Sequence, residues 1–354
     1  MKKRVCCLLL SLLLAGGLVG CAPFSSAPKR SQTYMDVFDT VTEITAYGMS
    51  EAEFTADVAK LHAELSAYHR LYDIYNTYPE LNNLKTVNDA AGGEPVKVDG
   101  RILDLLEYGL DAYERTDGQV NILFGAVLSL WHDAREQGLA HPESAALPDA
   151  AALTAASAHV SPDTLIIDRA AGTVRLTDPA ARIDVGAIAK GYAVEQVART
   201  AERELGWSSA LISVGGNIRT IGGKGGADSD TPFTVGIQNP DTSSAKTYLT
   251  TVNIADMAVV TSGDYQRYFT VDGKTYAHII DPDTLYPAAH VRAVTVVCAD
   301  SALADVLSTA LFCLPPAQGK ALLKKTPDAH AVWVLTDGSL NYSDGFTTYI
   351  GESV

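Results

Sequence analysis

The second half of the chain constrains the fold most, because helical and strand-like patterns follow one another there without regular alternation. Beyond Asp184 come a glycine-rich turn, a helix to about Leu205 and an apolar strand over 211–214. A second glycine-rich turn, several strands and an apolar helix near 301–314 complete the pattern. A doubly wound parallel sheet needs strands and helices in alternation. The sequence therefore predicts an α+β fold, in one domain because no repeat or linker divides it.

The first half adds helices and short strands to this pattern. Residues 34–47 alternate as in a strand, and Ser50 to Glu53 has the spacing of a capping box. A helix is predicted to follow, with one apolar face made of Phe54, Val58, Leu61, Leu65 and Tyr68. The spacing predicts a second helix over 101–115 and strands over 164–168 and 173–177.

The start of the chain has the pattern of an export signal over residues 1–20. Lys2, Lys3 and Arg4 precede an apolar run of 15 residues, which is shorter than the ~20 residues that span a bilayer. Leu18-Val19-Gly20-Cys21 resembles the bacterial lipobox, so Cys21 is expected to be the lipidated N-terminus. A plain signal peptide with a chance cysteine is the alternative.

The residues after Cys21 predict where the folded protein begins and where it is located. Residues 21–33 contain prolines and serines and are expected to form a flexible tether. The folded domain is predicted over 34–354. A lipid anchor at Cys21 would hold this domain at the cell membrane, on its extracytoplasmic side.

Charge and cysteine usage exclude some classes of function. Forty-two acidic and 27 basic side chains give a formal net charge of -15, which argues against nucleic acid as a partner. Cys298 and Cys313 lie in apolar stretches and are predicted to be core residues rather than a disulfide or ligands. No histidine or cysteine spacing is typical of a zinc site.

The segment from Asp184 to Tyr192 is expected to follow a strand, and it brings two glycines and a lysine to the expected start of a helix. Free backbone N–H groups and the helix dipole favour an anion there, and Lys190 adds a full charge. Gly186 and Gly191 have the spacing of a Walker loop, but Tyr192 stands where its lysine belongs. Phosphate binding and a tight turn with a surface lysine both remain open.

Two further patterns carry possible chemistry. A strand predicted over 276–280 delivers His278 into a turn, where it can act as a general base or a hydrogen-bond donor to phosphate, or be structural. In the helix near 301–314, Asp305 and Thr309 lie four residues apart and share a face. Such oxygen donors suit Mg²⁺. The alternative is a structural aspartate that accepts backbone hydrogen bonds, with Thr309 packed beside it.

Several segments, taken in order, make a joint pattern. The main ones are Asp184 to Ala193, Ser213 to Asn217, Thr261 to Tyr265, His278 to Thr284 and Ala304 to Leu311. Weaker ones are Phe38 to Thr40, Tyr72 to Tyr75, Val87-Asn88, Asp117 to Asn121 and Leu130-Trp131. Together they resemble the ApbE family of FAD:protein FMN transferases over nearly all of the mature chain.

This resemblance implies a T-fold-like α+β domain with mixed and antiparallel sheets. Such a domain would bind FAD, use Mg²⁺ and pass FMN to a Thr or Ser hydroxyl of a target flavoprotein, with release of AMP. The acceptor would be a redox-pump subunit or an extracytoplasmic flavoprotein. The alternatives are a Mg²⁺-dependent FAD pyrophosphatase, which releases FMN and AMP, and a non-catalytic lipid-anchored flavin-binding protein.

The resemblance also implies roles for individual residues. Asp305, Thr309 and a backbone oxygen of Ala187 would bind Mg²⁺, and His278 would help to activate the acceptor hydroxyl. The implied FAD contacts are Phe38, Tyr75, Gln119, Val120, Asn121, Asp184, Lys190 and Ile279.

The chain differs from the family pattern at several positions. Leu285 stands where the family often has glycine, Phe38-Asp39 where it often has Met-Gly, and Asn121 where many members have aspartate. These differences concern the substrate pocket more than the metal site.

Overall fold

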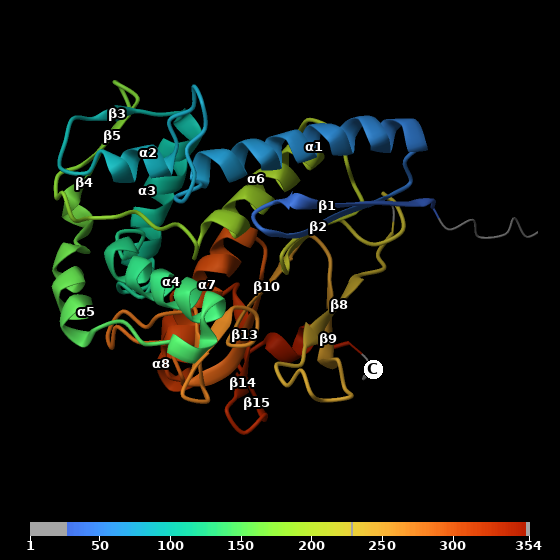
Figure 1. Ribbon diagram of the computed structural model, residues 1–354. Helices are drawn as coiled ribbons and strands as arrows, with labels where there is room; N and C mark the ends of the chain where they lie inside the picture. The colour runs from blue at the N-terminus through green and yellow to red at the C-terminus, as the bar shows by residue number, and fades with distance from the viewer. Residues whose placement is uncertain (1–26, 228, 352–354) are drawn as a thin grey trace, which may run out of the picture.

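An eight-stranded antiparallel sheet lies at the centre of the structure, a computed structural model that describes residues 27–227 and 229–351 (Figure 1). The order of its strands is β1-β2-β6-β7-β10-β13-β14-β15. Their bounds are β1 Lys29–Val37, β2 Thr40–Tyr47, β6 Ala210–Val214, β7 Asn217–Ile221, β10 Ala258–Gly263, β13 Val291–Cys298, β14 His330–Leu335 and β15 Leu340–Tyr342. This arrangement, with the helices described below, confirms the predicted α+β class.

Helices cover one face of this sheet. The helices α6 (Ala189–Arg203) and α7 (Ser301–Cys313) pack against each other and against the sheet, and α1 (Glu51–Tyr72) packs on α6. The capping box at the start of α1 and its buried face are formed as predicted. Each large apolar side chain that this face buries stabilises the fold by on the order of 2 kcal/mol.

A β-ribbon covers the opposite face of the large sheet. It consists of β8 (Phe233–Gln238) and β9 (Tyr248–Ile254). Neighbouring residues of β10 show the two faces, because Val260 belongs to the core under the helices and Val259 packs with the ribbon. This alternation is the period-two pattern of a sheet that is buried on both faces. The core is therefore divided between two layers, one on each side of the sheet.

Smaller elements surround one end of the sheet. A three-stranded sheet contains β3 (Val96–Lys97), β5 (Thr173–Leu176) and β4 (Leu165–Asp168), and a hairpin contains β11 (Tyr268–Val271) and β12 (Lys274–Ala277). The remaining α-helices are α2 Leu84–Asp89, α3 Gly100–Arg115, α4 Gly125–Ala140, α5 Ala150–Ala156 and α8 Pro316–Leu323. The predicted helix over 101–115 and the two predicted short strands correspond to α3, β4 and β5.

The structure corrects the sequence interpretation at the start of the folded domain. The first strand, β1, begins at Lys29, inside the segment expected to be a tether. The predicted strand over 34–47 is two strands joined by a turn at Phe38 and Asp39. Only Val37 of β1 is buried, because β1 is an edge strand of the sheet. An edge strand of this kind leaves little apolar alternation in the sequence.

A second correction concerns the strand expected before Asp184, which is not formed. Arg182 makes only an isolated bridge to Phe124. The side chain of Asn88 accepts a hydrogen bond from the amide of Ile183 and donates one to its carbonyl. A buried side chain therefore satisfies the backbone groups that a neighbouring strand would have paired. The strand predicted over 276–280 is β12, which begins earlier, at Lys274, and ends at Ala277, just before His278.

Cys298 and Cys313 are buried free thiols, as predicted for core residues. No helix in the described part of the chain is both long and apolar enough to cross a bilayer. The export signal, Cys21 and the first part of the predicted tether lie outside the described residues.

Candidate active site

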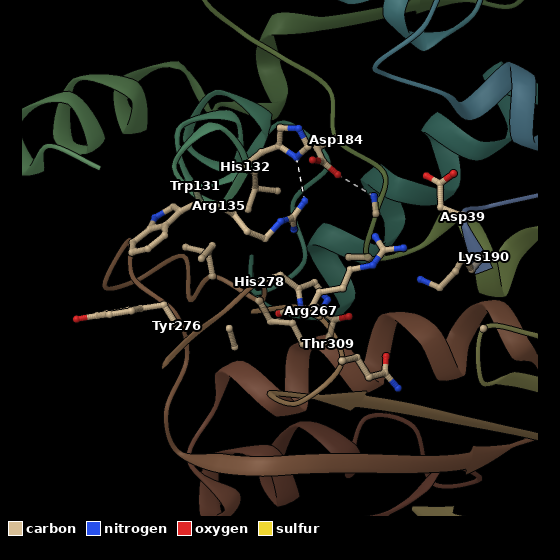
Figure 2. A pocket seen from close by; sticks show the side chains of 18 of the residues that line it. Asp39, Trp131, His132, Arg135, Asp184, Lys190, Arg267, Tyr276, His278 and Thr309 are labelled. Carbon is tan, nitrogen blue, oxygen red and sulfur yellow. Dashed lines mark hydrogen bonds between the residues drawn. The ribbon is translucent and has the colours of Figure 1, made fainter. Parts of the chain in front are cut away.

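A cleft of about 740 Å³ lies where the β1–β2 turn, α4, the start of α6 and α7 meet. The turn between β6 and β7 and the segments on either side of the β11–β12 hairpin also contribute residues. Figure 2 shows side chains from these elements directed into a common space. Segments far apart in the sequence are thus brought to one place.

Most of the residues implicated by the sequence line this cleft. They are Tyr75, Gln119, Val120, Asn121, Asp184, Ala187, Lys190, His278, Ile279 and Thr309. Phe38 and Asp305 are not among the lining residues. The structure therefore brings ten predicted residues together, and their roles stay predictions.

Phe38 is turned away from the cleft. Its ring packs edge to face on His69, and its backbone amide donates a hydrogen bond of 3.1 Å to Nδ1 of His69. The next two residues, Asp39 and Thr40, line the cleft instead. Phe38 and Asp39 have φ angles of 53° and 51°, a left-handed turn that places Asp39 at the cleft. The expected contact of Phe38 with a ligand is thus not supported by its position.

Asp305 lies on α7 behind the cleft and is 4% exposed. Its Oδ2 accepts a hydrogen bond of 2.8 Å from the backbone amide of Gly191. Burial raises the pKa of Asp305, while Lys190 and the Gly191 amide act in the opposite direction. Thr309 is one turn further along α7 and does line the cleft. A buried carboxylate thus lies close behind a hydroxyl that faces the cleft.

The start of α6 places Lys190 at the cleft. Gly186, Ala187 and Lys190 all line it, and α6 begins at Ala189. No ion pair of Lys190 occurs within residues 27–227 and 229–351. A helix N-terminus and an unpaired ammonium group together favour an anion at this point.

His278 is held in a defined tautomer. Its Nδ1 lies 3.1 Å from the backbone carbonyl oxygen of Arg267, which can only accept a hydrogen bond. Nδ1 therefore carries the proton, and Nε2 is left as a proton acceptor. Burial is the main cause that lowers the pKa of His278 to about 4, and the charges of Lys190, Arg267 and Arg135 lower it further. The imidazole is therefore neutral at physiological pH.

Asp184 and Tyr75 lie at another part of the cleft. Oδ1 of Asp184 accepts a hydrogen bond of 2.8 Å from the amide of Gly186, which shapes the loop before α6. Burial raises the pKa of Asp184. The ring of Tyr75 stacks on His132, with their centroids 4.7 Å apart. Tyr75 is still 54% exposed, so its ring can also contact a ligand.

The structure adds residues that the sequence interpretation missed. His132 and Arg135 of α4, Arg267, and the aromatic side chains of Phe269 and Tyr276 line the cleft. Arg135 donates to Glu136 and lies 3.1 Å from Nδ1 of His132. Two signals could have indicated some of them: Arg267 follows the Thr261–Tyr265 motif by two residues, and His132 follows Trp131.

The positions where the chain differs from the family pattern have structural explanations. Leu285 has a φ of 64°, a conformation in which glycine is favoured, and its carbonyl accepts a hydrogen bond from Nε1 of Trp131. Asn121 donates from Nδ2 to the carbonyl of Val160 and accepts at Oδ1 from the amide of Leu123. An ionised aspartate could not make the first of these hydrogen bonds.

A buried carboxylate, Glu195, fixes the position of α7 relative to α6. Its Oε2 accepts a hydrogen bond of 2.9 Å from the amide of Ser301, the first residue of α7. Arg199 and Arg219 also donate to Glu195. Glu195 is 4% exposed, so these contacts balance a charge that burial alone would make costly. They hold in place the two helices that carry Lys190 and Thr309.

Comparisons with known proteins agree with this architecture. A FAD:protein FMN transferase of Klebsiella pneumoniae (strain 342) is 33% identical over 273 residues, which is 75% of this chain and 81% of that protein. One of Treponema pallidum (strain Nichols) is 32% identical over 326 residues, 87% of this chain and 85% of that protein. The crystal structure of the ApbE protein of Thermotoga maritima MSB8 has a TM-score of 0.79 and 27% identity, and covers 92% of this chain and 100% of its own.

The fold, the cleft and the similarity to these relatives define an enzyme of the transferase class. The model of the ApbE family matches residues 38–333. The chain belongs to the ApbE family. The resemblance seen in the sequence motifs is thereby confirmed.

Proposed function

We propose that this enzyme transfers FMN from FAD to a Thr or Ser hydroxyl of a target flavoprotein and releases AMP. The observation that carries the proposal is the convergence of Lys190, His278 and Thr309 on one cleft. The names of the relatives support FAD as the donor and a protein as the acceptor. We include a requirement for Mg²⁺ in the proposal, on the basis of the oxygen donors near Thr309.

The size and lining of the cleft suit a flavin dinucleotide. Its volume of about 740 Å³ lies within the range of roughly 300–1,000 Å³ that is typical of small-molecule sites. Trp131, Phe269 and Tyr276 offer aromatic surface at one part of the cleft, and flat ring systems pack well on such groups. Lys190 offers positive charge for the pyrophosphate. One cleft thus combines aromatic surface for the flat rings of FAD with positive charge for its pyrophosphate.

The residues near Thr309 fit a magnesium ion. The carboxylate of Asp305 is buried and has no ion pair within the described residues. The amide of Gly191 donates to Oδ2 of this carboxylate, and the side chain of Asn217 lies close enough to lower the carboxylate's pKa. The remaining lone pairs of the carboxylate are available to a cation. The Thr309 hydroxyl and the carbonyl of Ala187 would complete the protein ligands, and these are the hard oxygen donors that Mg²⁺ prefers. Bound Mg²⁺ would neutralise negative charge that develops on the pyrophosphate.

The chain's own residues can carry the remaining chemistry. Nε2 of His278 is free to accept the proton of the acceptor hydroxyl. The hydroxyl oxygen then forms a bond to the phosphorus on the FMN side of the pyrophosphate. The bond from that phosphorus to the bridging oxygen breaks, and AMP leaves with the electron pair. The ammonium group of Lys190 stabilises negative charge on the phosphates throughout.

The proposal is tested with FAD, Mg²⁺ and a candidate acceptor flavoprotein. We expect equal amounts of AMP and of acceptor that carries FMN on a threonine or serine, measured by chromatography and by mass spectrometry of the acceptor. Free FMN and AMP without a modified acceptor would indicate a pyrophosphatase instead. Absence of AMP with several acceptors, despite flavin binding, would contradict both enzymatic readings.

We also propose that the enzyme is lipid-anchored through Cys21 on the extracytoplasmic side of the cell membrane. The support is the sequence pattern of residues 1–21. The test compares the wild type with Cys21→Ser in cell fractions. The wild type should be recovered with membranes and its N-terminal peptide should carry acyl chains. An unmodified N-terminal peptide in the membrane-bound wild type would contradict the anchor.

A further inference from the structure

Among the described residues, Arg267 adds a second unpaired cation to the cleft, besides Lys190. Its side chain lines the cleft, and Figure 2 shows it reaching into the space where Lys190 and His278 also lie. Its guanidinium has no ion pair or hydrogen bond in the described part of the chain. Arg135, by contrast, is already engaged by Glu136.

The backbone of Arg267 also holds His278. The carbonyl oxygen of Arg267 accepts two hydrogen bonds of 3.1 Å, one from the backbone amide of His278 and one from its ring Nδ1. The hydrogen bonds to the backbone of Arg267 therefore hold the imidazole of His278 close to the residue that carries the guanidinium. In agreement with this proximity, the positive charge of Arg267 is one of the causes that lower the pKa of His278.

An unpaired guanidinium in the cleft of an acidic protein calls for an anionic ligand. The chain has a formal net charge of -15, which repels anions at long range. Positive charge inside the cleft is therefore needed to bind one. The planar guanidinium can donate two parallel hydrogen bonds to a phosphate, and this geometry gives it direction as well as charge.

We propose that Arg267 is a further catalytic residue, whose guanidinium binds the phosphate on the FMN side of FAD, the group that the acceptor hydroxyl attacks. The assignment to this phosphate follows from the link to His278, because the base must lie near the oxygen that attacks. The inference rests on the proposed function. In the step described above, Arg267 donates hydrogen bonds to the non-bridging oxygens of that phosphate and neither gains nor loses a proton.

The charge of Arg267 lies on its side chain, while the contact with His278 is made by its backbone, so substitution can separate the two. Substitution of the side chain leaves the carbonyl that orients His278 in place, so Arg267→Gln removes the charge without removing the base. Arg267→Lys restores charge without the planar donor pair. Arg203→Gln is the matched control, because Arg203 is an exposed arginine in the last turn of α6 and does not line the cleft.

Binding of riboflavin, FMN and FAD to the purified full-length chain with Mg²⁺ is measured by calorimetry. We expect Arg267→Gln to weaken binding of FMN and FAD by about tenfold to a hundredfold and to leave riboflavin binding unchanged. Arg267→Lys should recover part of the loss, and the rate of AMP release should follow the same order. Arg203→Gln should resemble the wild type.

Three results would overturn the inference. Unchanged FAD affinity and AMP release in Arg267→Gln would remove the phosphate contact. An equal loss of riboflavin and FAD binding in both Arg267 variants would show a structural effect in place of phosphate recognition. Failure of the wild type to bind any phosphorylated flavin would overturn the proposed function as well, and this result is distinguishable because it appears before any substitution.

Discussion

The backbone amide of Gly191 donates a hydrogen bond of 2.8 Å to Oδ2 of Asp305, and this contact joins α6 to α7 behind the cleft. The close approach depends on the missing side chain of Gly191. A Cβ at this position would lie 2.4 Å from both Cβ of Asp305 and the carbonyl oxygen of Ser301. The two helices could not keep this spacing with any larger residue.

Gly191→Ala should therefore destabilise the enzyme by about 1–3 kcal/mol, the usual cost of overpacking. Denaturant unfolding measures this change. Gly100→Ala is the matched control, because a Cβ at Gly100, the first residue of α3, meets no atom within 4 Å. Equal stability of the two variants would contradict the close packing of α6 on α7.

Asp305→Asn should abolish Mg²⁺-dependent release of AMP, with a loss on the order of a hundredfold or more. Asparagine keeps an oxygen that can accept from Gly191 but removes the charge that would hold the cation. Circular dichroism should therefore remain that of the wild type. Asp305→Ala should lose activity to the same extent. Retention of Mg²⁺-dependent AMP release in either variant would contradict the metal site.

Glu195→Ala should destabilise the fold by about 3–5 kcal/mol, the range for breaking a buried ion pair. It leaves Arg219, whose side chain is only 12% exposed, without this partner. Glu202→Ala, on the exposed side of the same helix, provides the comparison. Urea unfolding curves that coincide for the two variants would show that Glu195 does not fix α7.

The lowered pKa of His278 predicts how activity depends on pH. Because its pKa falls from 6.5 to about 4, transfer should show no acid limb near pH 6.5 and should decline only as the pH approaches 4. Between pH 4 and pH 6.5, the imidazole of His278 binds a proton more readily in the unfolded chain than in the folded chain. The folded state therefore loses stability as the pH falls from 6.5 toward 4.

The matched variant for this prediction is His278→Gln. It should lose transfer but retain FAD binding, and the loss of stability between pH 6.5 and 4 should be smaller than in the wild type. Rates and unfolding curves over this pH range provide the test. An acid limb of the wild-type rate centred near pH 6.5 would contradict the lowered pKa of His278.

Local signals in the sequence predicted much of the fold. The capping box at Ser50 and the apolar spacing after it predicted the start and the buried face of α1. The first part of β1, residues 29–33, escaped prediction because this edge strand has one buried residue and lacks alternation there. The prediction of a strand before Asp184 was wrong because the side chain of Asn88 satisfies the backbone groups of Ile183 that a neighbouring strand would pair. Asn88 lies 95 residues away from Ile183 in the sequence, so no local pattern indicates this contact.

The residues of the candidate site were also predicted only in part. Residues inside recognisable motifs, such as Lys190 and His278, were found from the sequence and line the cleft. Arg135 was missed because only the tertiary packing of α4 brings it to the cleft, and Arg267 was missed although it lies two residues after the Thr261–Tyr265 motif. Asp305 accepts a backbone hydrogen bond from Gly191, as the alternative for this residue expected, but a donor on a second helix was beyond prediction because it depends on the spacing of two helices.

The most direct test of the account is a crystal structure of the enzyme with FAD and Mg²⁺. We predict the pyrophosphate at the start of α6, beside Lys190, with the metal ion bound by Asp305, Thr309 and the carbonyl of Ala187. A flavin bound elsewhere, with no metal density between α6 and α7 under conditions in which AMP is released, would contradict the account.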